Sequence, residues 1–293
     1  MVSTKKNPIQ ILTGSPGMIR AREIISGQYD EYRSAKFIEP HRRNFYSFFL
    51  VKQGYIRHSI DFTSYTCSQG EIFFMAPQQV YLVDAAEDFA GISINCQPEI
   101  LDTDELNLPV LRNISYYNKV SPGNEDLTEL RTLAERMVHI FRDHSPFSNE
   151  LMSAHLRTFL IYLSRSWIRE NPLIRERPEQ AAIVEKFRQL INQYWKEPIQ
   201  VTEYASRLHL TSGHLNTVVK ANTGKSANDL IHEKKLIEAK RLLIHTGLSV
   251  KEIAFQSGFD DPAYFSRFFK KWNNTTPLEF RDQIHEKYRS SPK

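Results

Sequence analysis

The 293-residue chain contains only two cysteines, Cys67 and Cys96, and both stand among apolar neighbours. Without a cluster of further cysteines or histidines they cannot form a structural zinc site, so we expect buried, reduced thiols. No apolar run approaches the ~20 residues that a membrane-spanning helix needs. The opening segment "MVSTKKNPIQ" is not followed by the hydrophobic stretch of a secretory signal. These absences predict a cytoplasmic protein that does not enter a membrane.

The charge of the chain is unevenly distributed. Residues 180–293 hold 18 Lys/Arg against 12 Asp/Glu, whereas residues 1–179 hold 20 against 22, within a formal net charge of +4. A mildly acidic half joined to a basic half is typical of a sensor attached to a domain that binds a polyanion. Many domains that bind no polyanion have the same excess of positive charge, so charge alone does not establish a polyanion partner. The length allows two domains.

The N-terminal half is rich in short extended segments. "AKFIEP", "NFYSFFLVKQG", "YIRHSIDF", "GEIFFMAP" and "GISIN" have the length and the aromatic and β-branched content of strands. "QG" at 53–54 and at 69–70 fits hairpin turns. Several short strands at this spacing predict an antiparallel barrel or sandwich. We assign residues 1–123 to this domain.

Helical periodicity begins at about Asn124. Residues 124–169 form two amphipathic patterns that are more apolar than one small sheet face requires. They fit an interface with a second copy of the chain and packing on the barrel equally well, and we predict a homodimer. "ENPLIRERPE" at 170–179 is charged, contains two prolines and reads as a linker. Residues 180–293 read as helical throughout.

The helical part contains a repeat. "VTEYASRLHLTSGHLNTVVKANTG" aligns with "VKEIAFQSGFDDPAYFSRFFKKWNN", first at an offset of 49 residues and then at an offset of 50. Each copy reads as a short helix, a tight turn and a second helix, which is the layout of a helix-turn-helix. The two motifs span residues 201–221 and 250–272. The fold class is therefore α+β: an antiparallel β-barrel with two following helices, then an all-α domain with two helix-turn-helix units.

Local physical requirements explain most residues of the repeat. Ala205 and Ala254 are small where two helices cross closely. Gly258 suits a left-handed turn conformation, which His209 tolerates in the first copy. Thr211, and Asp260 or Asp261, suit the N-cap of the second helix, and Ser249 with Glu252 forms a capping box. The inward stripes are predicted at Leu215, Val218, Val219, Phe265, Phe268 and Phe269.

The remaining side chains of the second helices face outward. A major groove admits one helix, and arginine reads guanine or asparagine reads adenine through two hydrogen bonds. Lysines late in each helix suit phosphates. The competing interpretation is an ordinary solvated surface, which two linked copies in the basic half disfavour.

These segments resemble the DNA-binding domain of the AraC/XylS family of bacterial transcriptional regulators. The resemblance covers about residues 180–285 and is carried by "LTSGHLNTVVKANTGKSANDLI", "KKLIEAKRLLIHTGLSVKEIAFQSGF" and "DPAYFSRFFKKWNNTTPLEFR". It implies two helix-turn-helix units joined by a linker helix, Ala227 to His245, whose recognition helices enter successive major grooves. Asn274 stands where the family usually has glycine.

The resemblance also implies the residues that contact DNA. The implied base-reading positions are Gly213, Asn216, Thr217, Pro262, Ala263, Tyr264 and Arg267. The implied phosphate contacts are His214, Lys220, Ser266, Lys270 and Lys271. Since Gly213, Pro262 and Ala263 have no side-chain donor, direct reading is expected to concentrate on Asn216, Thr217 and Arg267.

The N-terminal half resembles, less strongly, the cupin-like sensor barrel found in many family members. "EPHRRNFYSFFLVKQG" and "GEIFFMAPQQVY" carry this resemblance. Metal-binding cupins need clustered histidine and glutamate ligands, but the barrel has only His41 and His58, so we predict no metal, no cofactor and no enzymatic activity. His41, Arg42, Arg43 and Tyr46 are candidates for contacting an anionic or hydroxylated effector.

The resemblance implies a sequence-specific DNA-binding regulator, in a family where activation through RNA polymerase is the commoner mode. Its double-stranded DNA partner would be a promoter or operator. Two alternatives stay open. The barrel can serve dimerisation or protein contact without a ligand, because nothing in it specifies one. An enzyme fused to a helix-turn-helix would need a reactive cysteine or metal ligands, for which the sequence offers no support.

Overall fold

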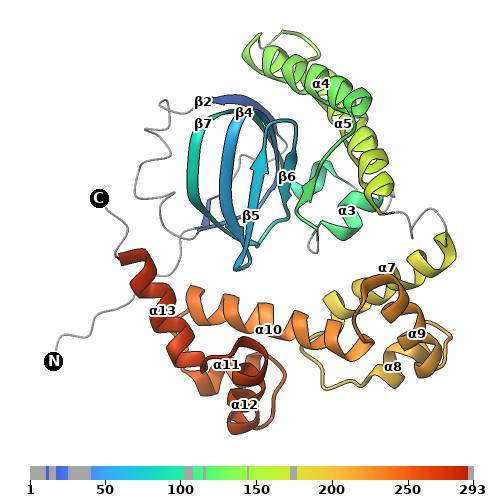
Figure 1. The fold of residues 1–293 in the computed structure, drawn as a ribbon, viewed down its shortest axis with the longest axis vertical. Helices are drawn as coiled ribbons and strands as arrows, with labels where there is room; N and C mark the ends of the chain where they lie inside the picture. Colours follow the sequence, from blue (N-terminus) through green and yellow to red (C-terminus); the bar gives the residue numbers. More distant parts are fainter. Residues whose placement is uncertain are drawn as a thin grey trace. The chain divides into compact units, whose positions relative to one another are not determined.

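The computed structural model describes residues 11–12, 18–25, 41–101, 108–114, 117–143, 145–171 and 177–289. The chain divides into two compact units, one within residues 10–172 and one within residues 173–293 (Figure 1). The first contains all the described strands, and the second is helical. Within the described ranges, none of the helices is long and apolar enough to cross a membrane.

The first unit is built on one curved sheet around two long strands (Figure 1). β4 (Tyr46–Ile60) and β7 (Val80–Cys96) pair along nearly their whole length. The order is β1-β3-β7-β4-β6-β8, with β2 on β7 and β5 on β4, and every pairing except β1 with β3 is antiparallel. The shorter strands are β1 (Ile11–Leu12), β2 (Ile19–Ile25), β3 (His41–Arg43), β5 (Thr63–Ser68), β6 (Ile72–Met75) and β8 (Lys119–Val120).

The antiparallel β domain predicted from the sequence is confirmed. Among the described strands the pairing forms an open path from β1 to β8, so the sheet curves without closing into a complete barrel. The predicted strand "AKFIEP" at 35–40 lies outside the described residues.

The predicted turn at 53–54 is wrong. β4 continues through Gly54, whose φ is +67°, and its register against β7 shifts on either side of this residue. A Cβ on Gly54 would lie 2.3 Å from the carbonyl oxygen of Glu87, so the glycine permits a β-bulge where two backbones approach closely. The hairpin between β4 and β5 instead turns at Asp61 and Phe62, both at positive φ. The predicted turn at 69–70 is confirmed, with Gly70 at φ +85°.

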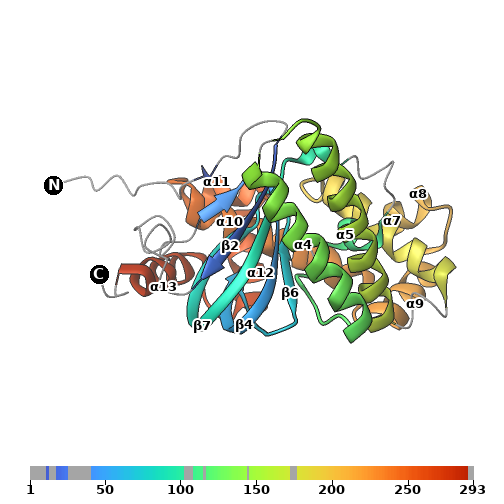
Figure 2. The same ribbon diagram turned by 90° about the horizontal axis from the view of Figure 1, so that it is seen from above.

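Two long helices cover one face of the sheet. α4 (Asn124–Asp143) and α5 (Ser148–Glu170) lie side by side, and both contact β2 (Figure 2). The ring of Phe48 on β4 meets that of Phe159 on α5 edge to face, with centroids 6.2 Å apart. The predicted packing of these helices on the sheet is therefore confirmed. Two short helices, η2 (Pro98–Ile100) and α3 (Pro109–Asn113), precede them.

A buried carboxylate joins α4 to α5. Asp126 is fully buried, and it accepts hydrogen bonds from Arg165, from Ser166 at 2.9 Å and from Arg169 at 3.0 Å. Burial raises the pKa of the Asp126 carboxyl, but hydrogen bonds from Arg165 and Ser166 and the two guanidinium charges outweigh it, so the pKa lies below its usual value. The cluster fixes the register of the two helices.

The second unit contains two cores joined by a long helix (Figure 1). Its described helices are α7 (Pro178–Tyr194), α8 (Val201–Arg207), α9 (Ser212–Thr223), α10 (Ala227–His245), α11 (Val250–Gln256), α12 (Pro262–Asn273) and α13 (Pro277–Arg289). Helices α7, α8, α9 and the start of α10 enclose the first core around Phe187 and Tyr204. The second core is aromatic: the ring centroids of Phe259 and Phe268 lie 4.9 Å apart, and those of Phe269 and Phe280 lie 5.6 Å apart.

Candidate DNA-binding interface

The two helix-turn-helix motifs have the same turn geometry. In the first, the backbone N–H of Leu210 donates to the carbonyl of Ala205 at 2.9 Å; in the second, Phe259 donates to Ala254 at 3.0 Å. Both alanines are buried, as the close helix crossing requires. The residue before each donor is left-handed: His209 has φ +57° and Gly258 has φ +74°. The repeat found in the sequence is therefore a structural repeat.

Caps define the ends of both second helices. The Thr211 hydroxyl accepts from the N–H of His214 at 3.2 Å, and the Asp261 carboxylate accepts from Ala263 at 2.8 Å. Asp261 rather than Asp260 is thus the N-cap of α12, with Pro262 following in the first turn. α9 ends at Gly224 and α12 at Asn274, both left-handed at φ +73° and +62°. Asparagine therefore replaces glycine here without loss of the cap geometry.

The inward faces of α9 and α12 match the prediction. The six predicted core side chains are all buried: Leu215, Val218, Val219, Phe265, Phe268 and Phe269. Phe259 and Phe265 meet edge to face at 5.3 Å. The aromatic residues of α12 thus belong to the core of the second unit, which leaves the opposite face of the helix to contact a partner.

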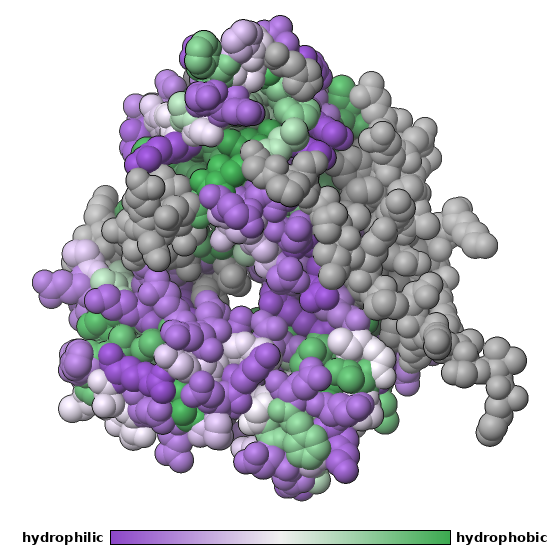
Figure 3. Space-filling view, turned by 180° about the vertical axis from the view of Figure 1, so that it is seen from behind, coloured by the Kyte–Doolittle hydropathy of each residue, from purple (hydrophilic) through white to green (hydrophobic). Residues whose placement is uncertain are grey.

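The outward faces present matching positions to solvent. The exposed members of the predicted set are Gly213, His214, Thr217 and Lys220 on α9, and Ala263, Tyr264, Arg267, Lys270 and Lys271 on α12. The Arg267 side chain is 70% exposed, and its guanidinium lies 3.8 Å from the Asp261 carboxylate. In Figure 3 hydrophilic residues predominate over the lower helices, with apolar patches between them. Pro262 and Ser266 are half-buried.

Asn216 differs from the other predicted readers. It is half-buried, and its Oδ1 accepts a hydrogen bond from the backbone N–H of Ala227 at 3.0 Å. This bond joins α9 to the first residue of α10. Ser266, at the equivalent position in α12, donates to the carbonyl of Pro262 at 2.9 Å. Thr217, one residue after Asn216, also donates within its helix, to the carbonyl of Gly213 at 3.0 Å. What separates the two pairs is exposure: Asn216 and Ser266 are half-buried, whereas Thr217 and Arg267 are exposed.

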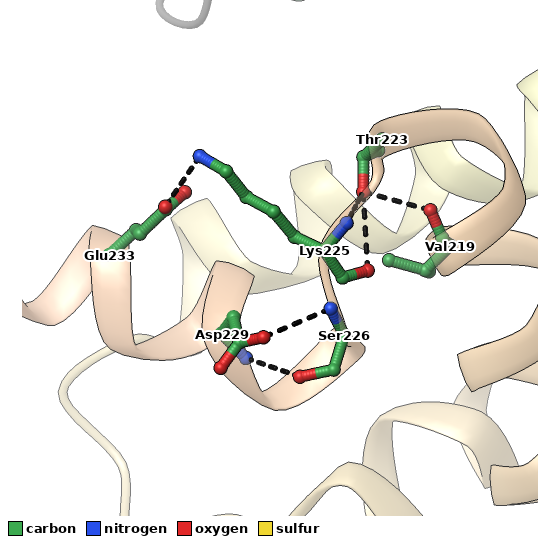
Figure 4. Close-up of polar contacts among 6 residues, drawn as sticks. All are labelled: Val219, Thr223, Lys225, Ser226, Asp229 and Glu233. Atoms are coloured by element: carbon green, nitrogen blue, oxygen red, sulfur yellow. Dashed lines mark hydrogen bonds and ion pairs between the residues drawn. The ribbon is translucent and has the colours of Figure 1, made fainter.

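The linker helix α10 begins at a strong cap (Figure 4). Ser226 and Asp229 exchange hydrogen bonds, each side chain with the backbone N–H of the other, which forms a capping box. Lys225, just before the helix, forms an ion pair at 2.5 Å with Glu233, which lies one turn beyond Asp229. At the other end, the Arg281 guanidinium donates to the carbonyls of Leu243 and Leu248 at 2.9 and 2.6 Å. Both ends of the predicted linker helix are thus fixed to their surroundings.

In the first unit the structure brings together two of the four effector candidates. His41 and Arg43 are buried on the same side of β3, and Arg42, between them, faces the other way. The Arg43 guanidinium donates to the Ser47 hydroxyl at 3.0 Å and lies 5.1 Å from the Tyr81 ring centroid. Tyr46 is half-buried, and burial raises the pKa of its phenol.

The same sheet carries polar residues that were not singled out from the sequence. The Ser47 hydroxyl donates to Asn95 Oδ1 at 2.7 Å, which extends the Arg43 cluster across β4 and β7. His58 is fully buried, and no described group hydrogen-bonds to either ring nitrogen. Burial, with the charge of Lys119, lowers its pKa to about 3, so this imidazole stays neutral. In the sequence, Ser47 and Asn95 are polar residues within the otherwise apolar segments "FYSFFLV" and "GISIN". This pattern could have marked them as functional candidates.

We expect His214→Ala and Asn216→Ala to separate DNA contact from folding. Loss of the Asn216 bond to α10 should lower the free energy of unfolding of the second unit by ~1 kcal/mol. His214 is exposed, so its replacement should change stability by less than ~0.5 kcal/mol and act on DNA affinity alone. Chemical denaturation and binding to a selected DNA site measure the two effects. Equal stability of the two variants would contradict the role given to Asn216.

Comparisons with known proteins agree with this arrangement. A helix-turn-helix domain model matches residues 204–283, and an AraC-like ligand binding domain model matches residues 24–160. The HTH-type transcriptional activator RhaR of Salmonella schwarzengrund is 21% identical over 255 residues, which cover 86% of this chain and 89% of RhaR.

Two solved structures are also similar. The C-terminal domain of the two-component response regulator YesN from Fusobacterium nucleatum shares 33% identity, covering 32% of this chain and 93% of that domain with a TM-score of 0.32. ToxT from Vibrio cholerae shares 15% identity, covering 91% of this chain and 98% of ToxT with a TM-score of 0.44. With an AraC-like ligand binding domain followed by a pair of linked helix-turn-helix motifs, the chain belongs to the AraC/XylS family of DNA-binding transcriptional regulators.

Proposed function

We propose that this regulator activates transcription from specific promoters in the cytoplasm, as a homodimer whose N-terminal unit binds a small effector. The observation that carries the DNA-reading part is the pair of matched recognition helices, α9 and α12, each with a buried apolar face and an exposed polar face. Activation is supported by the similarity of the chain to RhaR, which is a transcriptional activator. Contact with RNA polymerase follows from activation.

The exposed positions suggest how each helix reads DNA. We propose that Thr217 on α9, and Tyr264 and Arg267 on α12, reach base edges, because they are exposed on the outward faces of the recognition helices. His214, which is also exposed, keeps its assignment to a phosphate. Lys220, Lys270 and Lys271 lie further along the same helices and suit phosphates. Gly213, Pro262 and Ala263 would let the helix starts approach the groove closely. We assign Asn216 and Ser266 mainly to the fold.

The proposed effector site is the cluster around Arg43 in the first unit. A guanidinium held by the Ser47 hydroxyl and flanked by aromatic rings suits an anionic or hydroxylated molecule. His41, whose ring meets that of Tyr81 edge to face at 5.4 Å, lies beside it. A neutral His58 on the same sheet offers one donor and one acceptor. The alternative is a sheet that serves dimerisation or protein contact without a ligand.

A thermal-shift screen of the full chain separates these two possibilities. The panel consists of sugars, organic acids, aromatic compounds and amino-acid derivatives. We expect one class to raise the melting temperature saturably, by the equivalent of about 2.7 kcal/mol at a hundredfold excess over Kd. Ser47→Ala should reduce the effect, because it releases Arg43 and Asn95 from their shared partner. The absence of any saturable shift would favour the ligand-free alternative.

The dimer is proposed to form through α5. Leu151, Ala154, Thr158 and Ile161 are exposed at alternating spacings of three and four residues, which places them in one stripe along the helix. Leu151 and Ile161 remain 42% and 49% exposed. The outer face of α4 is polar instead, with Glu129, Thr132, Arg136 and His139 exposed. Of the two helices in 124–169, α5 is therefore the better candidate for a seam between two copies.

A further inference from the structure

A pocket of about 510 Å³ lies in the second unit and adjoins the start of α12. Its walls come from three places: residues 198–202 at the start of α8, one face of α10, and residues 258–261 with Tyr264. The first belongs to one helix-turn-helix motif and the last to the other. A molecule in this pocket would therefore touch both motifs and the helix that joins them. The volume falls within the range of small-molecule sites, about 300–1,000 Å³.

The pocket contains a buried ammonium group. Lys235 on α10 is only 9% exposed. Its Nζ lies 3.5 Å from the carbonyl oxygen of Glu197 and 5.2 Å from the centroid of the Phe259 ring, and no described carboxylate is within ion-pair distance. An ammonium has three donors, and burying one without an anionic partner is costly. Burial lowers the pKa of Lys235, and the negative charge of Asp260, which forms no described ion pair with Lys235, offsets this shift only in part. A bound carboxylate would supply the missing partner.

The rest of the lining limits the chemistry of the occupant. Ile199, Val201, Ile231 and Phe259 form apolar walls that suit an apolar body. Asp260 and Asp261 are exposed at the same pocket. These two carboxylates at the pocket would repel a dianion or a nucleic-acid backbone. An occupant that pairs with Lys235 should therefore carry only one negative charge.

We propose that this pocket binds a small monocarboxylate with an apolar body, as a second ligand site within the DNA-binding unit. The proposal goes beyond the proposed function, because it places a ligand on the second unit rather than on the sheet of the first. Tyr264 forms part of both the pocket wall and the exposed face of α12. An occupant would therefore contact α12 and could change the spacing of the two recognition helices. We expect it to weaken DNA binding.

The test is calorimetric titration of the full chain with 3-phenylpropionate as the probe. We expect saturable one-to-one binding with a Kd below about 1 mM. The neutral analogue 3-phenylpropanamide should bind at least ~10-fold more weakly, because it cannot pair with a buried charge. Lys235→Met should lose the preference for the carboxylate, whereas Lys234→Met, its neighbour on α10 outside the pocket lining, should keep it. Absence of saturable binding up to about 10 mM would overturn the proposal.

Two further variants keep the result unambiguous. Asn228→Trp introduces bulk at the pocket wall without touching Lys235, so it should abolish binding even if Lys235→Met fails to fold. Thr132→Ala, on the polar outer face of α4 and outside both proposed ligand sites, should bind the probe as the wild type does. Equal binding by Lys235→Met or Asn228→Trp and the wild type would show that the probe sits elsewhere and overturn the site. The effector screen and the DNA-binding experiments test the proposed function separately, and their results do not depend on this titration.

Discussion

Replacing Gly258 by alanine is expected to destabilise the second unit by about 2–5 kcal/mol and to abolish DNA binding. The left-handed backbone costs an alanine roughly 1–2 kcal/mol. A Cβ at this position would also lie 2.0 Å from the carbonyl oxygen of Lys196, a backbone atom in the segment between α7 and α8. Relieving that overlap means separating the two helix-turn-helix motifs, which adds a packing cost of ~1–3 kcal/mol. Thermal unfolding should shift by at least ~10 °C for the second unit.

Gly224→Ala is the matched control for this prediction. Gly224 is also left-handed, at φ +73°, but a Cβ there meets nothing within 4 Å. The Gly224→Ala variant should lose only the stability that the left-handed backbone costs an alanine, roughly 1–2 kcal/mol. It should still bind DNA. His209 supports the distinction, because it adopts φ +57° at the position equivalent to Gly258 and is exposed. Equal losses in the two alanine variants would mean that the contact with Lys196 does not decide the identity of residue 258.

Ile161→Asp is expected to convert the proposed homodimer into a monomer. In a two-fold seam the same stripe of α5 is contributed by both copies, so the substitution would bring two carboxylates into one apolar interface. Like charges at an interface cost several kcal/mol, so dimerisation should weaken by at least ~100-fold. Sedimentation velocity over a range of concentrations measures the change. Binding to a DNA site with two copies of the recognised sequence should fall as well, because the second contact is no longer intramolecular.

The control for the seam lies on the neighbouring helix. His139→Asp changes an exposed residue on the polar face of α4 and adds the same charge. It should leave the dimer intact. Monomeric wild-type protein, or an Ile161→Asp variant that sediments as a dimer, would contradict the assignment of α5.

The helical unit was more predictable from the sequence than the sheet, for physical reasons. Helix ends depend on local groups such as the Ser249–Glu252 capping box, and both recognition helices begin at a predicted N-cap and end within two residues of the expected position. Gly54 illustrates the difficulty in the sheet. A glycine at positive φ serves a turn or a bulge equally well, and only the approach of the Glu87 backbone, more than thirty residues away, decides between them.

The recognition face was predictable as a face but not residue by residue. Helical periodicity predicted Asn216 on the outward face, but the residue is half-buried. Its hydrogen bond to Ala227 depends on where α10 begins relative to α9. The effector candidates show the same limit. Alternation along β3 separates Arg42 from His41 and Arg43, whereas the partnership of Arg43 with Ser47, and of Ser47 with Asn95, depends on the pairing of β4 with β7.

The most direct test of the central claim is selection of binding sites from random DNA, followed by affinity measurements with two variants. If α9 and α12 both read bases, each subunit should enrich two short elements about 10 base pairs apart, one helical turn. Arg267→Ala should cost ~1–3 kcal/mol and relax the preference in one element only. Lys270→Ala should instead weaken binding to all sequences and reduce the salt slope by about one unit. A single enriched element, or identical effects of the two substitutions, would contradict reading by two recognition helices.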